Sequence, residues 1–141
     1  GERRGPPGAC EAALGMASDR GGALVTLVSE TNLFPTKNFE LPSCEERIRL
    51  GRAKENDLQI DQKGTSWFHC EIRLLETEKR GSGGEIVKVR DTSTNGVGLK
   101  APGSSVQRLT RGQDTPVPDG SVITMPYKIK AEDGKVAEEQ L

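Results

Sequence analysis

Three short polar segments carry the side chains that could do chemistry. Residues 50–56 read LGRAKEN, residues 62–67 read QKGTSW and residues 91–96 read DTSTNG. An arginine guanidinium offers a rigid fork of N–H donors, and serine and threonine hydroxyls add single donors at short reach. Together these groups suit a phosphorylated side chain. Each segment taken alone also fits an ordinary surface turn.

Alternating apolar residues around these segments predict β-strands. Every second side chain of residues 68–74 is apolar, from Phe68 to Leu74. Shorter runs of the same kind cover residues 23–29, 47–50, 57–61, 86–89, 97–99 and 121–125. Turn-forming stretches lie between them, around Pro35 and at residues 51–56, 64–66, 80–84, 92–96, 101–105 and 116–120. This spacing predicts an all-β fold, a sandwich of two antiparallel sheets whose loops at one end form the binding surface.

The predicted sandwich occupies the middle of the chain. Residues 1–22 mix Gly, Pro, Arg and Glu without periodicity, which predicts a flexible leader, and Met16 within it is a candidate native start. The folded domain is expected over residues 23–130. Residues 131–141 are expected to be a flexible tail or linker.

Composition excludes several classes of function. The 141 residues hold 20 Lys and Arg against 21 Asp and Glu, a net charge of −1, so no basic excess supports nucleic-acid binding. No apolar run approaches the roughly 20 residues of a membrane span, and no secretory signal pattern is present. Three cysteines without a close pair indicate neither a disulfide framework nor a metal site, and they fit a reducing, intracellular compartment.

The order of three motifs resembles the forkhead-associated (FHA) domain. Its G-R, S-x-x-H and N-G motifs have matches in the same order and at similar separations, at Gly51-Arg52, Ser66–His69 and Asn95-Gly96. Residues 118–123 are similar to a later turn and strand of the family, and the resemblance covers about residues 23–130. It implies an eleven-stranded β-sandwich that binds phosphothreonine peptides through the loops at one end.

The resemblance also implies roles for individual residues. Arg52 would contact the phosphate and Ser66 would donate its hydroxyl to it. Thr94 would support the phosphate-facing loop, and Asn95 would bond to the peptide backbone beside the phosphothreonine.

Other positions would hold the loops or add to the peptide surface. Gly51 and Gly96 resemble the family's backbone-geometry residues, and His69 resembles its buried histidine that braces the loops. Trp67 departs from the Arg, Lys or Asn usual after the serine; it could pack on a peptide side chain, stack on Arg52 or anchor the loop. Charge could come instead from neighbouring lysines, Lys54 and Lys63. A second departure is Val97-Gly98, where Thr and an aromatic residue are more usual.

The expected function is therefore phosphothreonine-dependent docking without catalysis, cofactor or metal. The resemblance implies that the partner is a protein that carries phosphothreonine, that phosphothreonine is preferred over phosphoserine, and that the isolated domain is a monomer. It also implies a larger parent protein, nuclear or cytoplasmic, that acts in signalling, the cell cycle or the DNA-damage response. One alternative is a β-sandwich scaffold that binds an unphosphorylated partner. A hydrolase built on Ser66, His69 and Asp91 is the other, but the chain lacks a G-x-S-x-G elbow and holds one histidine.

Overall fold

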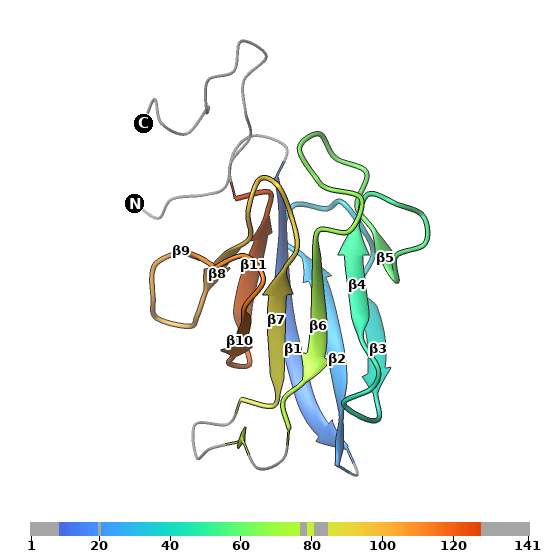
Figure 1. Cartoon of the computed structure of the whole chain (residues 1–141), viewed down its shortest axis with the longest axis vertical. Coiled ribbons are helices and arrows are strands. Elements are labelled where there is room, and N and C mark those ends of the chain that lie inside the picture. Colours follow the sequence, from blue (N-terminus) through green and yellow to red (C-terminus); the bar gives the residue numbers. More distant parts are fainter. Residues whose placement is uncertain (1–8, 20, 77–78, 81–84, 128–141) are drawn as a thin grey trace.

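Strands and the loops between them make up almost all of the computed structural model, which describes residues 9–19, 21–76, 79–80 and 85–127. Figure 1 shows the strands in chain order. Their bounds are β1 Cys10–Asp19, β2 Gly22–Ser29, β3 Lys37–Leu41, β4 Ile48–Gly51, β5 Leu58–Gln59, β6 Cys70–Leu74, β7 Val87–Asp91, β8 Gly98–Lys100, β9 Gln107–Arg108, β10 Asp114–Val117 and β11 Ser121–Met125.

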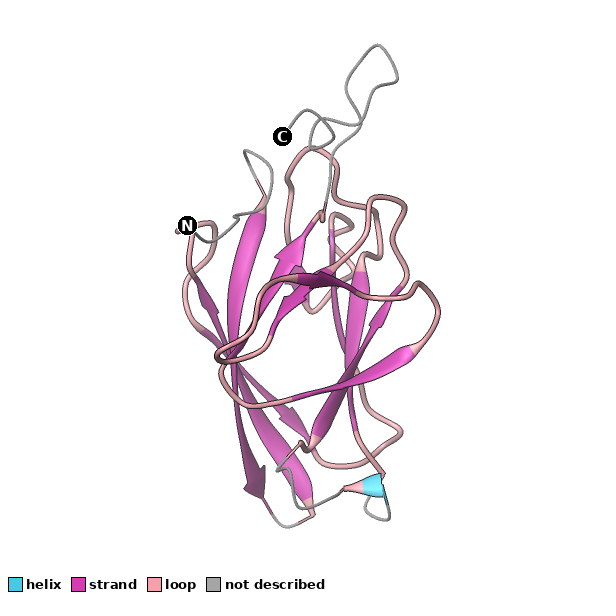
Figure 2. Cartoon of the chain, turned by 90° about the vertical axis from the view of Figure 1, so that its left-hand side faces the viewer, coloured by secondary structure: helices cyan, strands magenta, loops and turns pink. Residues whose placement is uncertain are grey.

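The strands form two sheets that face each other, as the side view in Figure 2 shows. One sheet has the order β3-β2-β1-β11-β8-β9 and the other has the order β10-β7-β6-β4-β5. Among the named strands, every pairing of two strands is antiparallel except that of β4 with β5, in which Leu50 lies opposite Leu58. The predicted all-β sandwich is confirmed, with this one parallel pair.

Aliphatic side chains from the inward faces of both sheets fill the core. In β6 the buried residues Cys70, Ile72 and Leu74 alternate with half-buried Glu71 and Arg73, the period expected of a strand with one face in the core. Full burial of one Val, Leu or Ile side chain contributes about 1.5–3 kcal/mol of transfer free energy. The core thus supplies a rigid support for the loops at its ends.

The first strand corrects the prediction of a flexible leader over residues 1–22. Cys10–Asp19 form β1, which pairs with β11 on one side and with β2 on the other. Cys10, Ala12 and Leu14 are buried in the core. The leader prediction is therefore wrong for this stretch, while residues 1–8 lie outside the described part of the chain.

The start of β6 corrects a second expectation, that Phe68 shares the core face of Cys70. The strand begins at Cys70, and Phe68 is 42% exposed, with the guanidinium carbon of Arg49 5.0 Å from its ring centroid. The backbone before Cys70 bonds instead to the neighbouring loop, since Ala53 N donates to Trp67 O. That bonding interrupts the alternation on which the prediction rested.

The predicted turn at residues 116–120 is wrong in its first half. Asp114–Val117 form β10, an edge strand, and Val117 is buried. Proline lacks the N–H that a central strand needs, and for that reason Pro116 is tolerated at an edge. Pro118–Gly120 form a turn, with Gly120 at φ +86°. The tail expected over residues 131–141 lies outside the described residues.

Candidate functional site

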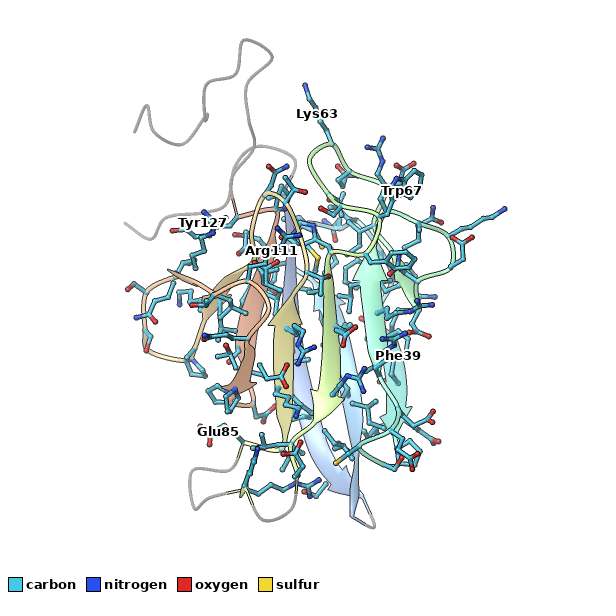
Figure 3. The ribbon with its side chains drawn as sticks, in the orientation of Figure 1. Phe39, Lys63, Trp67, Glu85, Arg111 and Tyr127 are labelled. Carbon is cyan, nitrogen blue, oxygen red and sulfur yellow. The ribbon has the colours of Figure 1, made fainter. Side chains whose placement is uncertain are left out.

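The three polar segments lie together at one end of the sandwich. The first begins at the end of β4, the second follows β5, and the third begins at Asp91, the last residue of β7. Figure 3 labels Lys63, Trp67 and Tyr127 at this end, far from Glu85 at the other end. Segments that are separated by up to about 40 positions in sequence therefore form one surface, which we call the loop tip (residues 51–56, 62–67 and 91–96).

Backbone hydrogen bonds hold the first two segments against each other. Arg52 N donates to Ser66 O at 2.9 Å, and Ala53 N donates to Trp67 O at 3.1 Å. This close approach requires glycine at position 51, because a Cβ there would collide with Trp67 O and lie 2.8 Å from His69 N. The backbones of Arg52 and Ser66 are thus direct neighbours.

The side chain of Asn56 holds two segments of the loop tip together, a role that the sequence did not predict. Its side chain is buried, and Nδ2 donates at 2.7 Å both to Ala53 O and to Trp67 O. The amide therefore closes the first segment on itself and ties it to the second. An asparagine inside a short polar loop was the available signal, but it is equally typical of a solvated turn.

The second and third segments meet through side chains. Ser66 Oγ accepts a hydrogen bond from Thr94 N at 3.0 Å, and Asn95 Nδ2 donates to Gly64 O at 2.9 Å. A hydroxyl that accepts through a lone pair keeps its O–H for donation. Ser66 can therefore still donate to an anion while it positions Thr94.

The third segment is shaped by a buried aspartate and serine. Asp91 Oδ1 accepts from Ser93 N at 2.8 Å and from the Ser93 hydroxyl, and Ser93 Oγ accepts from Gly96 N at 2.8 Å. Gly96 has φ +91°, the left-handed region that the Asn-Gly pair predicts. Asp91 and Ser93 thus set the course of the turn that presents Thr94 and Asn95.

His69 joins the second and third segments from beneath. The ring is fully buried, Nδ1 accepts from Ser66 N at 3.0 Å, and Nε2 lies 2.8 Å from Gly96 O. Because a carbonyl only accepts, Nε2 carries the proton and the ring is the neutral Nε2–H tautomer. Burial lowers the pKa of His69, opposed by the bond to Gly96 and the charge of Asp91.

These bonds leave no Ser–His couple for hydrolysis. The imidazole binds the backbone N–H of Ser66 and not its hydroxyl, and its other nitrogen faces a backbone carbonyl. Asp91 bonds to Ser93 and not to the ring. The geometry is that of a structural histidine.

Arg52 presents a guanidinium that is held by an acidic neighbour. Its Nε lies 3.1 Å from Asp61 Oδ1, and the side chains are 48% and 72% exposed. An ion pair at such exposure contributes little to stability, so breaking it costs little free energy. Asp61 was predicted only as part of a strand, and nothing in its local pattern pointed to Arg52.

The remaining predicted residues of the loop tip have exposed side chains. Lys54 and Lys63 are exposed on the first and second segments, and Trp67 is 68% exposed beside Ser66. An exposed tryptophan does not anchor its loop in the core, so that alternative for Trp67 is wrong.

The described residues also bear on two other chemistries, metal binding and thiol reactivity. No group of His, Cys, Asp and Glu among them is arranged to hold a metal ion, and none of their helices is long and apolar enough to cross a membrane. Burial raises the pKa of Cys10 to about 12 and raises that of Cys70 further, so both thiols stay protonated.

Comparison with known families now decides the identity of this fold. The family model of the FHA domain matches residues 48–126, more than half of the chain. The chain belongs to the FHA domain family. FHA domains are binding modules and not enzymes, and they generally mediate phosphopeptide-dependent protein–protein interaction. The match includes all three segments of the loop tip. No curated protein is similar enough to this FHA domain to count as a match.

The neutral His69 predicts a fall in the stability of this FHA domain in acid. The ordinary pKa is 6.5 and the folded pKa is lower, so below pH 6.5 the unfolded chain binds a proton that the folded chain refuses. Above that pH, His69 should not lower the free energy of unfolding. As the pH drops below 6.5, the free energy of unfolding should fall by up to roughly 1.4 kcal/mol per pH unit, until the pH passes the folded pKa. Urea titrations at pH 7.5, 6.5 and 5.5 measure it.

The control is His69→Gln, since the chain holds no other histidine. That variant should be less stable at pH 7.5 by about 1–3 kcal/mol, the cost of breaking buried hydrogen bonds, and nearly insensitive to pH between 7.5 and 5.5. Equal pH profiles for wild type and variant would show that His69 does not govern the acid response.

Proposed function

We propose that this FHA domain binds phosphothreonine in an extended peptide through the loop tip. The observation that carries the proposal is that Arg52, Ser66, Thr94 and Asn95, far apart in sequence, are joined by hydrogen bonds at one end of the sandwich. Recognition would involve no chemical step. A rigid scaffold that presents donors to an anion accounts for all of these contacts.

In this proposal the phosphate displaces Asp61 from Arg52. A phosphorylated threonine carries a charge near −2 and three acceptor oxygens, whereas Asp61 offers one negative charge. The guanidinium can bond two phosphate oxygens at once, while Nε alone bonds to Asp61 here. The Ser66 hydroxyl would donate to a further oxygen.

The other loop residues would bind the rest of the peptide. Asn95 would bond to the peptide backbone, with Thr94 supporting the turn. Lys54 and Lys63 would add positive charge, and Trp67 would pack on a peptide side chain. The preference for phosphothreonine over phosphoserine rests on the family resemblance. Three further expectations stay predictions: a monomeric state, no affinity for nucleic acid, and a nuclear signalling role.

A direct test compares one peptide in three forms at pH 7.5. A pool with fixed phosphothreonine first identifies a bound sequence, which is then made with phosphothreonine, phosphoserine and unmodified threonine. We expect binding in that order of decreasing affinity, measured by calorimetry. Equal affinity for the phosphorylated and unmodified forms would contradict the proposal.

The scaffold alternative would use a sheet face or edge, and the structure argues against one of these surfaces, the outer face of the five-stranded sheet. Ion pairs cover it, including Arg47 with Glu71 and Lys88 with both Glu76 and Asp114. Hydrogen bonds from Lys88 and Lys79 lower the pKa of Glu76, so the network stays charged at neutral pH. The cores of protein–protein interfaces are depleted in charged residues, so this charged face is better suited to contact with water than to contact with a partner protein.

Replacement of Arg52 is expected to weaken phosphopeptide binding without loss of the fold. Each charge-assisted bond is worth about 1.5–3 kcal/mol, so Arg52→Ala should lower affinity about tenfold or more. Its melting temperature should barely change, because the bond to Asp61 is exposed. Arg52→Lys should also bind weakly, since an ammonium lacks the fork.

Asp61→Asn is the matched variant. It releases the same guanidinium and removes a negative charge, so it should raise phosphopeptide affinity. Unchanged affinity in Arg52→Ala would refute the assignment of the phosphate site.

A further inference from the structure

Arg108 lies against the loop tip on the side away from Arg52. It belongs to β9, where it pairs with Gly98 of β8. Strand β8 begins two residues after Gly96, and Leu109 N donates to Val97 O at 2.9 Å, so the end of β9 lies next to the Asn95–Gly96 turn. Figure 1 shows β8 and β9 at the opposite side of the molecule from β4 and β5.

The contact between Arg108 and that turn is close. A Cβ at Gly96 would lie 2.8 Å from Arg108 Nε and 3.1 Å from its Cζ, so the guanidinium lies over the bare backbone of the glycine. The guanidinium carbon is also 5.7 Å from the ring centroid of Tyr127, whose backbone N–H donates to Gly96 O at 2.8 Å. The turn and the ring therefore hold the head group in place.

Among the described residues, no carboxylate neutralises the charge of Arg108. The residue is exposed, and no carboxylate of the described residues forms an ion pair with it, whereas Arg52 has Asp61. The two contacts described above, a glycine backbone and an aromatic face, supply no negative charge. A pre-oriented guanidinium without an ion-pair partner in the described part of the chain, at the margin of a peptide site, favours an anionic ligand group.

We propose that Arg108 forms a second anion subsite that binds a carboxylate or phosphate side chain of the same peptide. This inference rests on the proposed function. A peptide anchored at Arg52 and Ser66 and bonded to Asn95 crosses the turn on which Arg108 lies. The domain then selects phosphothreonine peptides that carry a second negative charge on the segment beyond that turn.

The test uses a phosphothreonine peptide pool with the flanking positions varied on both sides. Wild type should select Asp, Glu or phosphoserine at one flanking position, and Arg108→Gln should lose that selection while still binding phosphothreonine. For single peptides, Arg108→Gln should lower affinity for the acidic sequence about two- to fivefold, the range of exposed ion pairs, and leave the alanine-substituted peptide unaffected. Aspartate and phosphoserine peptides compared side by side identify the preferred anion.

Two variants separate a specific contact from a general charge effect. Lys37→Gln removes one positive charge from β3, the opposite edge of the same sheet, and should retain the acidic selection. Arg108→Glu should turn the preference at that position from acidic to basic, a reversal that a structural role could not produce.

The outcomes distinguish the two proposals. Phosphothreonine binding without any acidic preference, or a preference that survives Arg108→Gln, would overturn the second subsite alone. Absence of binding to every phosphothreonine peptide would overturn the proposed function, and the second subsite with it.

Discussion

Removal of residues 1–15 is expected to unfold the domain. The deletion removes Cys10–Gly15, which supply the entire pairing of β1 with β11 and half of its pairing with β2. It also removes the buried side chains of Cys10, Ala12 and Leu14. Because β1 joins β2 and β3 to β11, β8 and β9, its loss divides the six-stranded sheet. The free energy of unfolding of a domain is only about 5–15 kcal/mol, so we do not expect the fold to survive the loss of this pairing and burial.

Circular dichroism and thermal melting measure this result. The truncated chain, which begins at Met16, should lack a cooperative unfolding transition. A cooperative melt near that of the full chain would show that β1 is dispensable.

A pair of substitutions in the full chain controls for the shortened length. Leu14→Ala empties a buried position and should cost about 2–5 kcal/mol, whereas Ala17→Ser changes an exposed position of the same strand and should cost less than about 0.5 kcal/mol.

Gly51→Ala is expected to destabilise both the fold and the loop tip. The new Cβ would collide with Trp67 O and lie 2.8 Å from His69 N, and both are backbone atoms that cannot rotate away. Relief requires a shift of residues 66–69, which carry Ser66 and the brace His69. We expect a loss of about 2–4 kcal/mol, a fall in melting temperature of roughly 10 °C or more, and weaker phosphopeptide binding.

Gly15→Ala is the matched control, because Gly15 also lies in a strand at an ordinary φ. The nearest atom to its Cβ would be 3.8 Å away, an ordinary contact. That variant should be neutral or slightly stabilising, since alanine loses less backbone entropy than glycine on folding. Similar melting temperatures for the two variants would refute the steric requirement at Gly51.

The short polar segments were predictable because their chemistry is local. The glycine after β4, the Asn-Gly turn and the S-x-x-H spacing each depend on neighbouring residues, and the order of these motifs was enough to predict an FHA sandwich. Even the buried position of His69 followed from its motif.

The first strand was missed because its local signal is weak. Its buried positions alternate as in any strand, but they include Cys10 and Ala12, small residues with little strand preference of their own. Backbone pairing with β2 on one side and with β11 on the other forms the strand despite this weak intrinsic preference. Phe68 was misplaced for the converse reason, since a strong local alternation extended two residues beyond the point where the strand begins.

By itself, the sequence determined the sandwich, the spacing of its loops and the residue types that those loops offer. Only the tertiary structure decided that Asp61 holds Arg52, that Asn56 and Asp91 brace the tip, and that Arg108 lies on Gly96. The reason is physical: turns and strand faces follow from adjacent residues, whereas these contacts join distant segments and depend on how the strands pair and how far each loop reaches.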